Sequence, residues 1–233
     1  MPLPVVLVPG LNCSLRLYAP QLPTLWQIGP VVVADHRSDE RIADIAERIL
    51  ADAPPRFALV GLSMGGYIAF EILRQASARI AGLALLDTSA RPESADQTIR
   101  RKAQIDMARG GRFDEIVEQM FAVLSRSAGL GDARMQELIR TMAAETGPDA
   151  FIRQQTAIMG RADSRPTLST LRCPTLVVVG EEDKLTPPEL AVEIAQGIPD
   201  ARLEVVAECG HLSTLDQPER VTTILGSWMR TLA

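Results

Sequence analysis

Ser63 lies in a segment that is typical of a nucleophilic serine. It is flanked by glycines in the sequence Gly61-Leu62-Ser63-Met64-Gly65, after an apolar run and before an amphipathic one. A serine on a sharp turn between a strand and a helix needs small neighbours, because the backbone passes close to itself there. Free N–H groups at the start of that helix could hold a developing oxyanion, and the Met64 N–H is the first candidate donor. The motif predicts acyl-transfer chemistry at Ser63.

A serine hydroxyl needs a general base, and the chain contains two histidines. His211 comes just after the last apolar run, and His36 comes after the second one. In the class of proteins with this glycine-flanked serine, the acid and then the base follow the serine in the chain. This order selects His211 as the base. His36 is then expected to be a hydrogen-bonding residue in a loop beside the cleft.

The acid that orients the base should end a strand that lies between the serine and the histidine in the chain. Residues 181–183 are all acidic and follow directly on an apolar run. Asp183 is the best placed of them, because it lies just before the expected start of the next helix. Asp87, which ends the apolar run 83–86, is the alternative acid.

Short apolar runs must supply the strands that position these side chains. Most of them are continuous rather than alternating, which indicates strands buried on both faces of a parallel sheet. Helical patterns follow several of the runs, and this alternation predicts an open α/β sheet with right-handed crossovers. The runs are Pro4–Val8, Val31–Ala34, Phe57–Val60, Leu83–Leu86, Thr175–Val179 and Leu203–Ala207.

Two helix starts can be predicted from capping patterns. Thr186-Pro-Pro-Glu189 reads as a capping box with proline in the first turn, and the helix should run to about Gln196. Asp216-x-x-Glu219 should open the last helix in the same way.

Residues 91–165 interrupt the alternation of strands and helices. They show no strand pattern, and their apolar residues recur at helical spacing. We therefore expect one domain, with a core of residues 1–90 and 166–233 and an inserted helical segment at 91–165. This segment holds 12 of the 24 Lys and Arg residues, but 11 acidic residues offset them, which favours a solvated outer face. Its candidates for lining an acyl pocket are Phe121, Met142 and Met159.

Over essentially its whole length the chain resembles the α/β-hydrolase family. The motifs that carry the resemblance are V-P-G-L at 8–11, V-A-D-H-R at 33–37, V-G-L-S-M-G-G at 60–66, L-L-D-T at 85–88, C-P-T-L-V-V-V-G-E-E-D-K-L-T-P at 173–187 and C-G-H-L at 209–212. The resemblance implies that Ser63 is the nucleophile, His211 the base and Asp183 the acid. It also implies that residues 91–165 form a helical lid, and that the backbone N–H of Leu11 is the second oxyanion donor.

Two features depart from the family pattern. The family's N-terminal β-hairpin is missing, since the first strand begins at residues 2–4, so the α/β-hydrolase sheet should have about six strands, mostly or wholly parallel. The histidine-glycine pair that is usual in the oxyanion loop is replaced by Pro9-Gly10. The backbone N–H of Leu11 does not depend on that histidine, so we still expect an active enzyme.

The expected function is hydrolysis of a small carboxylic ester through an acyl-enzyme intermediate, with no metal and no organic cofactor. A serine cannot replace the carboxylate nucleophile of the dehalogenases and epoxide hydrolases of this fold. A lactonase, or a C–C-bond hydrolase of aromatic degradation, is the alternative within the fold. Both of these enzymes would need a cation for a substrate carboxylate, which Arg37 or an arginine of 91–165 could supply. A non-catalytic receptor for a small ligand is the alternative from another class.

The composition limits which binding partners and which cellular compartment can be expected. A net charge of −5 and a pI of about 5.2 offer no electrostatic footprint for nucleic acid. Cys13, Cys173 and Cys209 form no C-x-x-C pair, so neither a disulfide framework nor a zinc site is expected, and Cys13 and Cys209 should be packing residues. The sequence shows no signal peptide pattern and no bilayer-spanning stretch. We expect a cytoplasmic protein that binds a small-molecule ester and no membrane; a homodimer is left open.

Overall fold

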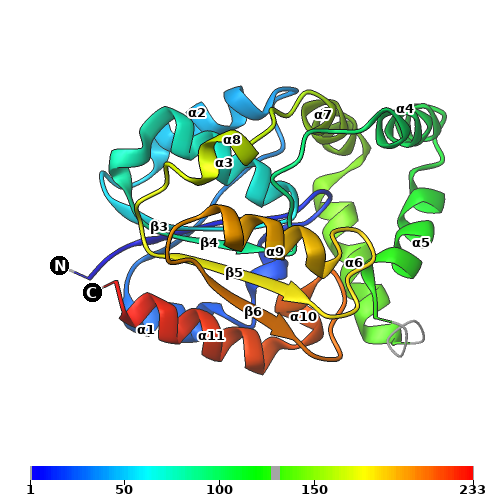
Figure 1. Cartoon of the computed structure of the whole chain (residues 1–233). Coiled ribbons are helices and arrows are strands. Elements are labelled where there is room, and N and C mark those ends of the chain that lie inside the picture. Colours follow the sequence, from blue (N-terminus) through cyan, green and yellow to red (C-terminus); the bar gives the residue numbers. More distant parts are fainter. Residues whose placement is uncertain (1, 127–131, 233) are drawn as a thin grey trace.

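The computed structural model describes residues 2–126 and 132–232 of the chain. Six parallel strands form one sheet in the order β2-β1-β3-β4-β5-β6 (Figure 1). Each of the six apolar runs forms one of these strands, so the predicted fold class is confirmed. The strands are β1 (Val5–Val8), β2 (Val31–Val33), β3 (Phe57–Leu62), β4 (Ile80–Leu86), β5 (Thr175–Gly180) and β6 (Arg202–Val206).

Helices cover both faces of the sheet, which is why β1, β3, β4 and β5 consist of buried residues throughout. On one face, α2 (Ile42–Asp52), α3 (Met64–Ala76) and α9 (Pro188–Gly197) pack against the sheet, and the short α8 (Arg165–Leu168) contacts α9. On the other face lie α1 (Leu22–Ile28) and α11 (Pro218–Arg230). Shorter turns are η1 (Leu15–Tyr18), η2 (Ser77–Arg79) and α10 (Ser213–Asp216).

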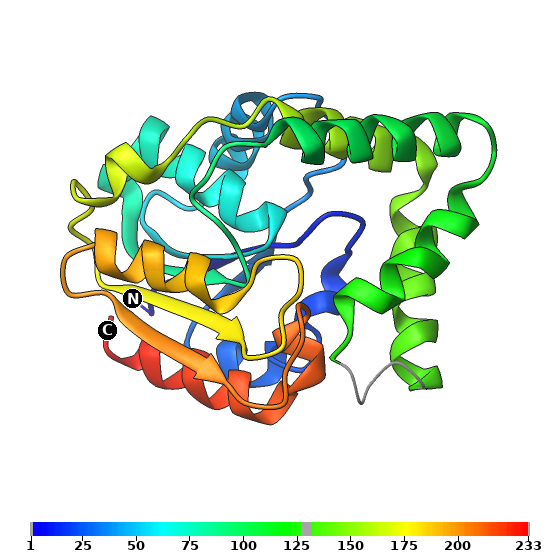
Figure 2. The same ribbon diagram turned by 45° about the vertical axis from the view of Figure 1, so that its right-hand side comes forward.

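The inserted segment forms helices between β4 and β5. They are α4 (Ala95–Arg109), α5 (Phe113–Leu124), α6 (Ala133–Thr146) and α7 (Pro148–Met159). Figures 1 and 2 show them gathered beyond the carboxyl ends of the strands. A capping box starts α4: the Ser94 hydroxyl accepts from the Gln97 N–H, and the Gln97 side chain accepts from the Ser94 N–H. Parallel α/β sheets place their sites at this edge, so the insertion lies where a site is expected.

Both predicted caps are wrong in detail. Helix α9 begins at Pro188, and the Thr186 side chain makes no cap bond because its hydroxyl donates to Asp183 at 2.7 Å instead. Helix α11 begins at Pro218, and the Asp216 carboxylate accepts from the Gly210 N–H at 2.6 Å. In both cases the residue expected as a cap forms a hydrogen bond within the loops at the carboxyl edge of the sheet and not with the helix that follows.

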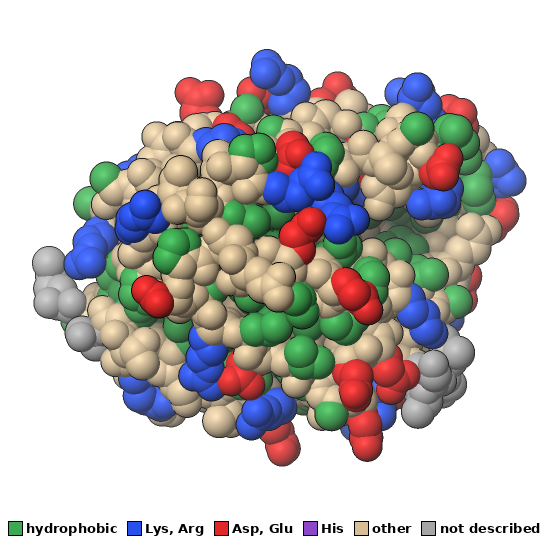
Figure 3. Space-filling model, in the orientation of Figure 1, with side chains coloured by type: hydrophobic (Ala, Val, Ile, Leu, Met, Phe, Trp, Pro, Cys, Tyr) green, Lys and Arg blue, Asp and Glu red, His purple; other side chains and the backbone are tan. Residues whose placement is uncertain are grey.

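The face of the molecule drawn in Figure 3 carries basic and acidic side chains that are interspersed. Several charged side chains of the protein form ion pairs, such as Arg91 with Glu193 at 2.9 Å. Within residues 2–126 and 132–232, no helix has the length and apolar character that crossing a membrane requires.

Candidate active site

Ser63 is the one residue between the end of β3 and the start of α3. Its backbone has a φ of 55° and a ψ of −114°, a strained conformation for a residue with a side chain. A Cβ on Gly61 would overlap the Gly65 carbonyl, and a Cβ on Gly65 would overlap the Val8 carbonyl. The two glycines therefore allow the sharp turn and the close approach of α3 to β1, and the turn presents the Ser63 hydroxyl at the carboxyl edge of the sheet.

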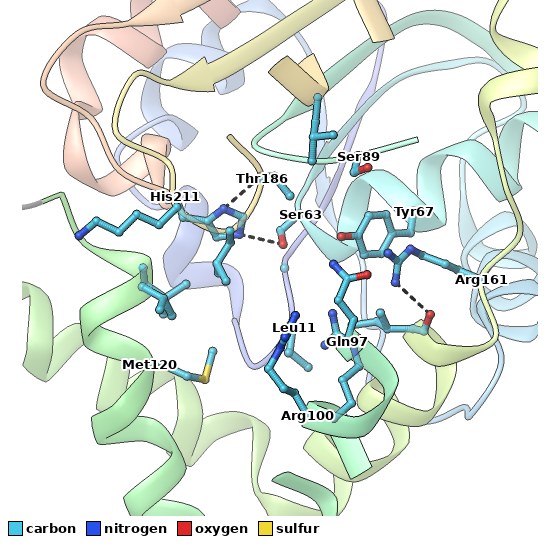
Figure 4. Close-up of a pocket in the computed structure, with 18 of the residues that line it drawn as sticks. Leu11, Ser63, Tyr67, Ser89, Gln97, Arg100, Met120, Arg161, Thr186 and His211 are labelled. Carbon is cyan, nitrogen blue, oxygen red and sulfur yellow. Dashed lines mark hydrogen bonds between the residues drawn. The ribbon is translucent and has the colours of Figure 1, made fainter. Parts of the chain in front are cut away.

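His211 lies between Ser63 and Asp183. Its Nε2 is 2.9 Å from the Ser63 Oγ, and its Nδ1 is 2.8 Å from the Asp183 Oδ2. Figure 4 shows the ring of His211 beside the Ser63 hydroxyl and Thr186. The His211 and Asp183 residues are 2% and 3% exposed. The three side chains that the sequence selected from separate segments thus form one hydrogen-bonded line, with the imidazole in reach of the serine hydroxyl.

The electrostatics of this line favour a charged pair of acid and imidazolium. Burial by itself would lower the pKa of His211, but the charge of Asp183 and its hydrogen bond outweigh burial and raise that pKa. Burial opposes ionisation of Asp183 as well, and the His211 charge and hydrogen bonds from Thr186 lower its pKa overall. The carboxylate also accepts from the Leu185 N–H at 2.8 Å and the Thr186 N–H at 3.0 Å. Asp183 is therefore held ionised and fixed in orientation.

Asp87, the alternative acid, contacts other groups. Its Oδ1 accepts from the Gly180 N–H at 3.0 Å, and its Oδ2 accepts from the Ser213 hydroxyl at 2.5 Å. Burial, and then the charge of Asp183, raise the pKa of Asp87 to about 7. Asp87 joins β4 to β5 and α10 and makes no hydrogen bond to His211, so the geometry favours Asp183 as the partner of the imidazole.

Thr186 is a site residue that sequence reasoning missed. Its hydroxyl donates to Asp183, and the same oxygen is 3.3 Å from the His211 Nδ1. The sequence pattern around Thr186 matched a helix cap, and nothing in its spacing distinguished a cap from a support for the acid.

The loop after β1 lies against Ser63. A Cβ on Gly10 would be 3.4 Å from the Ser63 Cβ, and Leu11 follows with a backbone N–H that has no acceptor within the described part of the chain. Two buried bonds fix this loop: the His36 Nε2 is 2.9 Å from the Gly10 carbonyl, and the Asn12 N–H donates to Gln154 at 2.9 Å. His36 is thus the structural histidine that the sequence indicated. On the other side of Ser63, the Met64 N–H is the first of α3 and has no partner within that helix.

A cavity of about 610 Å³ opens in front of Ser63 and His211. Helix α5 supplies an apolar part of its wall, from Met120, Val123 and Leu124. The candidates Phe121, Met142 and Met159 do not line it; Phe121 and Met142 are buried in a hydrophobic core cluster instead. Helix periodicity identified apolar faces correctly, but it could not tell which face turns towards Ser63.

The buried cysteines are poor nucleophiles. Cys13 lines the cavity, but burial raises the pKa of its thiol to about 12. Burial, and after it the nearby carboxylates, also raise the pKa of Cys209. Both residues belong to the core cluster, as packing residues would. Across the described residues, no three His, Cys, Asp or Glu side chains gather as metal ligands would.

The fold and the site together define the class of protein. The sequence model of the alpha/beta hydrolase family matches residues 5–224, and the chain therefore belongs to this family. Its resemblance to that family and the predicted fold are confirmed.

Individual relatives agree with this assignment. The chain is 27% identical to the pimeloyl-[acyl-carrier protein] methyl ester esterase of Aromatoleum aromaticum, over 96% of the chain and 91% of the esterase. It is similar in structure to a malate-bound thermophilic esterase from Thermogutta terrifontis, with a TM-score of 0.90, 31% identity and coverage of 99% and 90% of the two chains. The enol-lactonase from Burkholderia xenovorans shares the fold, with a TM-score of 0.88, 23% identity and coverage of 99% and 92%. The family and the two esterases support hydrolase activity.

Proposed function

We propose that the protein hydrolyses small carboxylic esters through an acyl-enzyme on Ser63, with His211 as the base and Asp183 as the acid. The observation that carries the proposal is the position of His211, at 2.9 Å from the Ser63 Oγ and 2.8 Å from the Asp183 Oδ2. This geometry suits a base that must receive the serine proton. The esterases among the relatives support an ester as substrate.

The proposed reaction has two steps. In the first, His211 Nε2 accepts the Ser63 proton while Oγ attacks the ester carbonyl carbon, and the Leu11 and Met64 N–H groups stabilise the oxyanion. The C–O bond to the alcohol then breaks, and His211 returns the proton to the leaving oxygen. In the second step a water molecule loses a proton to His211 and attacks the acyl-enzyme. The acid is released as Ser63 regains its proton.

We also propose that residues 91–165 act as a lid over this reaction. Support comes from α4, α5 and α7, which contribute to the wall of the cavity in front of Ser63. Residues 1–90 and 166–233 would then be the core that holds the three reacting side chains. A cytoplasmic location and a homodimer stay predictions, which cell fractionation and sedimentation would test.

Ester turnover by Ser63→Ala tests the proposal. The variant should retain the fold, as seen by circular dichroism, and lose several orders of magnitude in kcat for p-nitrophenyl butyrate, because the nucleophile is removed. Unchanged turnover by the variant would refute Ser63 as nucleophile. Stoichiometric binding of an ester without turnover by the wild type would favour a receptor on the same fold.

A further inference from the structure

Two arginines share a single buried carboxylate beside the cavity. The Glu93 Oε1 accepts from the Arg101 Nε at 2.7 Å, and its Oε2 accepts from Nη1 of Arg161. The side chains of Glu93, Arg101 and Arg161 are 2%, 18% and 5% exposed. Guanidinium groups keep their proton in proteins, so these three residues hold one positive charge that no carboxylate among them balances. A buried charge is unfavourable unless a partner compensates it.

Each of the two guanidinium groups keeps a free donor. Arg161 uses Nε for the Arg91 carbonyl at 3.0 Å and Nη1 for Glu93 and the Ile158 carbonyl, and it lies over the Tyr67 ring at 4.4 Å (Figure 4). Arg101 uses Nε for Glu93 and Nη1 for a glutamine. Neither Nη2 has an acceptor within residues 2–126 and 132–232. Both side chains line the cavity in front of Ser63.

Arg100 adds a third cation. It lines the same cavity, points into it in Figure 4, and pairs with no carboxylate of the described residues. The side chains that α4 turns to the cavity recur at helical spacing and are all polar, two of them cationic and one, Asp96, anionic: Asp96, Gln97, Arg100, Arg101 and Gln104. In Figure 4, Met120 of the apolar wall from α5 lies apart from Gln97 and Arg100 of α4, across the open space of the cavity. Three other charged residues line the cavity. Arg91 pairs with Glu193, and the charges of Lys184 and Asp96 have opposite signs and sum to zero.

We infer that the α4 side of the cavity binds an anionic group of the substrate, a carboxylate or a phosphate. The inference rests on the proposed function. The planar forks of Arg100, Arg101 and Arg161 suit two or three anionic oxygens, and a bound anion balances the charge that Glu93 leaves uncompensated. The apolar wall from α5 holds the chain between the anion and the ester. The substrate is thus an ester with an apolar middle and an anionic end.

Three matched esters test this inference. They are p-nitrophenyl esters of glutaric acid, of its ω-amide and of 4-phosphonobutyric acid, which differ in the group at the far end. The wild type should prefer an anionic ester over the amide by about tenfold or more in kcat/KM at low salt, as expected for a charge-assisted hydrogen bond. The preference should fall as ionic strength rises, because Arg100 is exposed. The carboxylate and phosphonate arms identify which anion is bound better.

Arg100→Gln should remove most of that preference. Arg109→Gln is the matched control, since Arg109 ends the same helix, carries the same charge and does not line the cavity. The control should keep the preference. Equal rates for all three esters in the wild type, or an unchanged preference in Arg100→Gln, would overturn the inference while leaving the proposed function intact. A wild type that hydrolyses none of the esters would overturn the proposed function itself.

Binding gives a readout that does not need turnover. Ser63→Ala should bind the glutarate ester more tightly than the amide ester in calorimetry, by a similar factor. Loss of this difference when Arg100→Gln is added would support the inference, and equal affinities for the two esters in Ser63→Ala alone would contradict it.

Discussion

Two buried carboxylates lie near His211, and they differ in what they contact. Asp183 bonds to His211 at 2.8 Å, whereas Asp87 bonds to Gly180 and Ser213. Only a carboxylate bonded to Nδ1 can hold the imidazole in the tautomer that accepts a proton at Nε2. Asp87, whose pKa is raised to about 7, makes no hydrogen bond to His211, so a perturbed pKa alone would have selected a carboxyl group that does not contact the imidazole.

Asp183→Asn should therefore lower kcat/KM for an ester by about 10⁴-fold, because the amide favours the wrong tautomer. Asp87→Asn should cost less than about tenfold, since an amide can still accept from the Gly180 N–H and donate to Ser213. Steady-state kinetics on both purified variants make the comparison. If Asp87→Asn were the more damaging change, the acid would have been assigned wrongly.

The pKa of His211 sets the expected pH dependence. Only the neutral imidazole can accept the Ser63 proton, and the folded protein raises the pKa of His211 above its ordinary 6.5. Activity should thus be lost as pH falls through a value above 6.5, and be restored as pH rises past it. A profile of kcat/KM between pH 5 and 9 measures this. An acid limb centred below 6.5 would contradict the electrostatic account.

At the scale of elements, α5 turns neighbouring residues to opposite sides. Met120 lines the cavity, while Phe121 is 7% exposed and packs in the core. Sequence periodicity places both residues on one apolar stripe of α5. It does not tell which part of the stripe faces the cavity and which part faces the core. The way in which α5 packs at the edge of the sheet decides which of the two residues faces the cavity. This packing is a tertiary property.

Met120→Ala should shift the preferred acyl chain by one or two carbons towards longer esters, because each buried methylene contributes about 0.8 kcal/mol. Phe121→Ala is the matched control: it should lower the free energy of unfolding by about 3 kcal/mol or more without that shift. A series of p-nitrophenyl esters and a urea titration separate the two effects. An equal acyl preference in the wild type and Met120→Ala would show that α5 does not set chain length.

At the scale of the whole molecule, the sheet was predictable because burial on both faces leaves continuous apolar runs such as Thr175–Val179. The positions of Ser63 and His211 followed from strand ends and chain order. The roles of the residues around them could not be predicted. The sequence predicts Thr186 as a helix cap, but its hydroxyl donates to Asp183. The sequence predicts the cations of α4 on a solvated face, but they line a cavity. Those roles depend on how the inserted helices pack over the edge of the sheet. The periodicity of apolar residues in the sequence does not specify that packing.

Covalent labelling is the most direct test of the proposed nucleophile, Ser63. A fluorophosphonate should modify the wild type at Ser63, as located by peptide mass spectrometry, and should leave Ser63→Ala unlabelled. Labelling should also slow markedly in His211→Ala, since the base that activates the hydroxyl is removed. Modification at Cys13 or Cys209, or undiminished labelling of Ser63→Ala, would show that Ser63 is not the nucleophile.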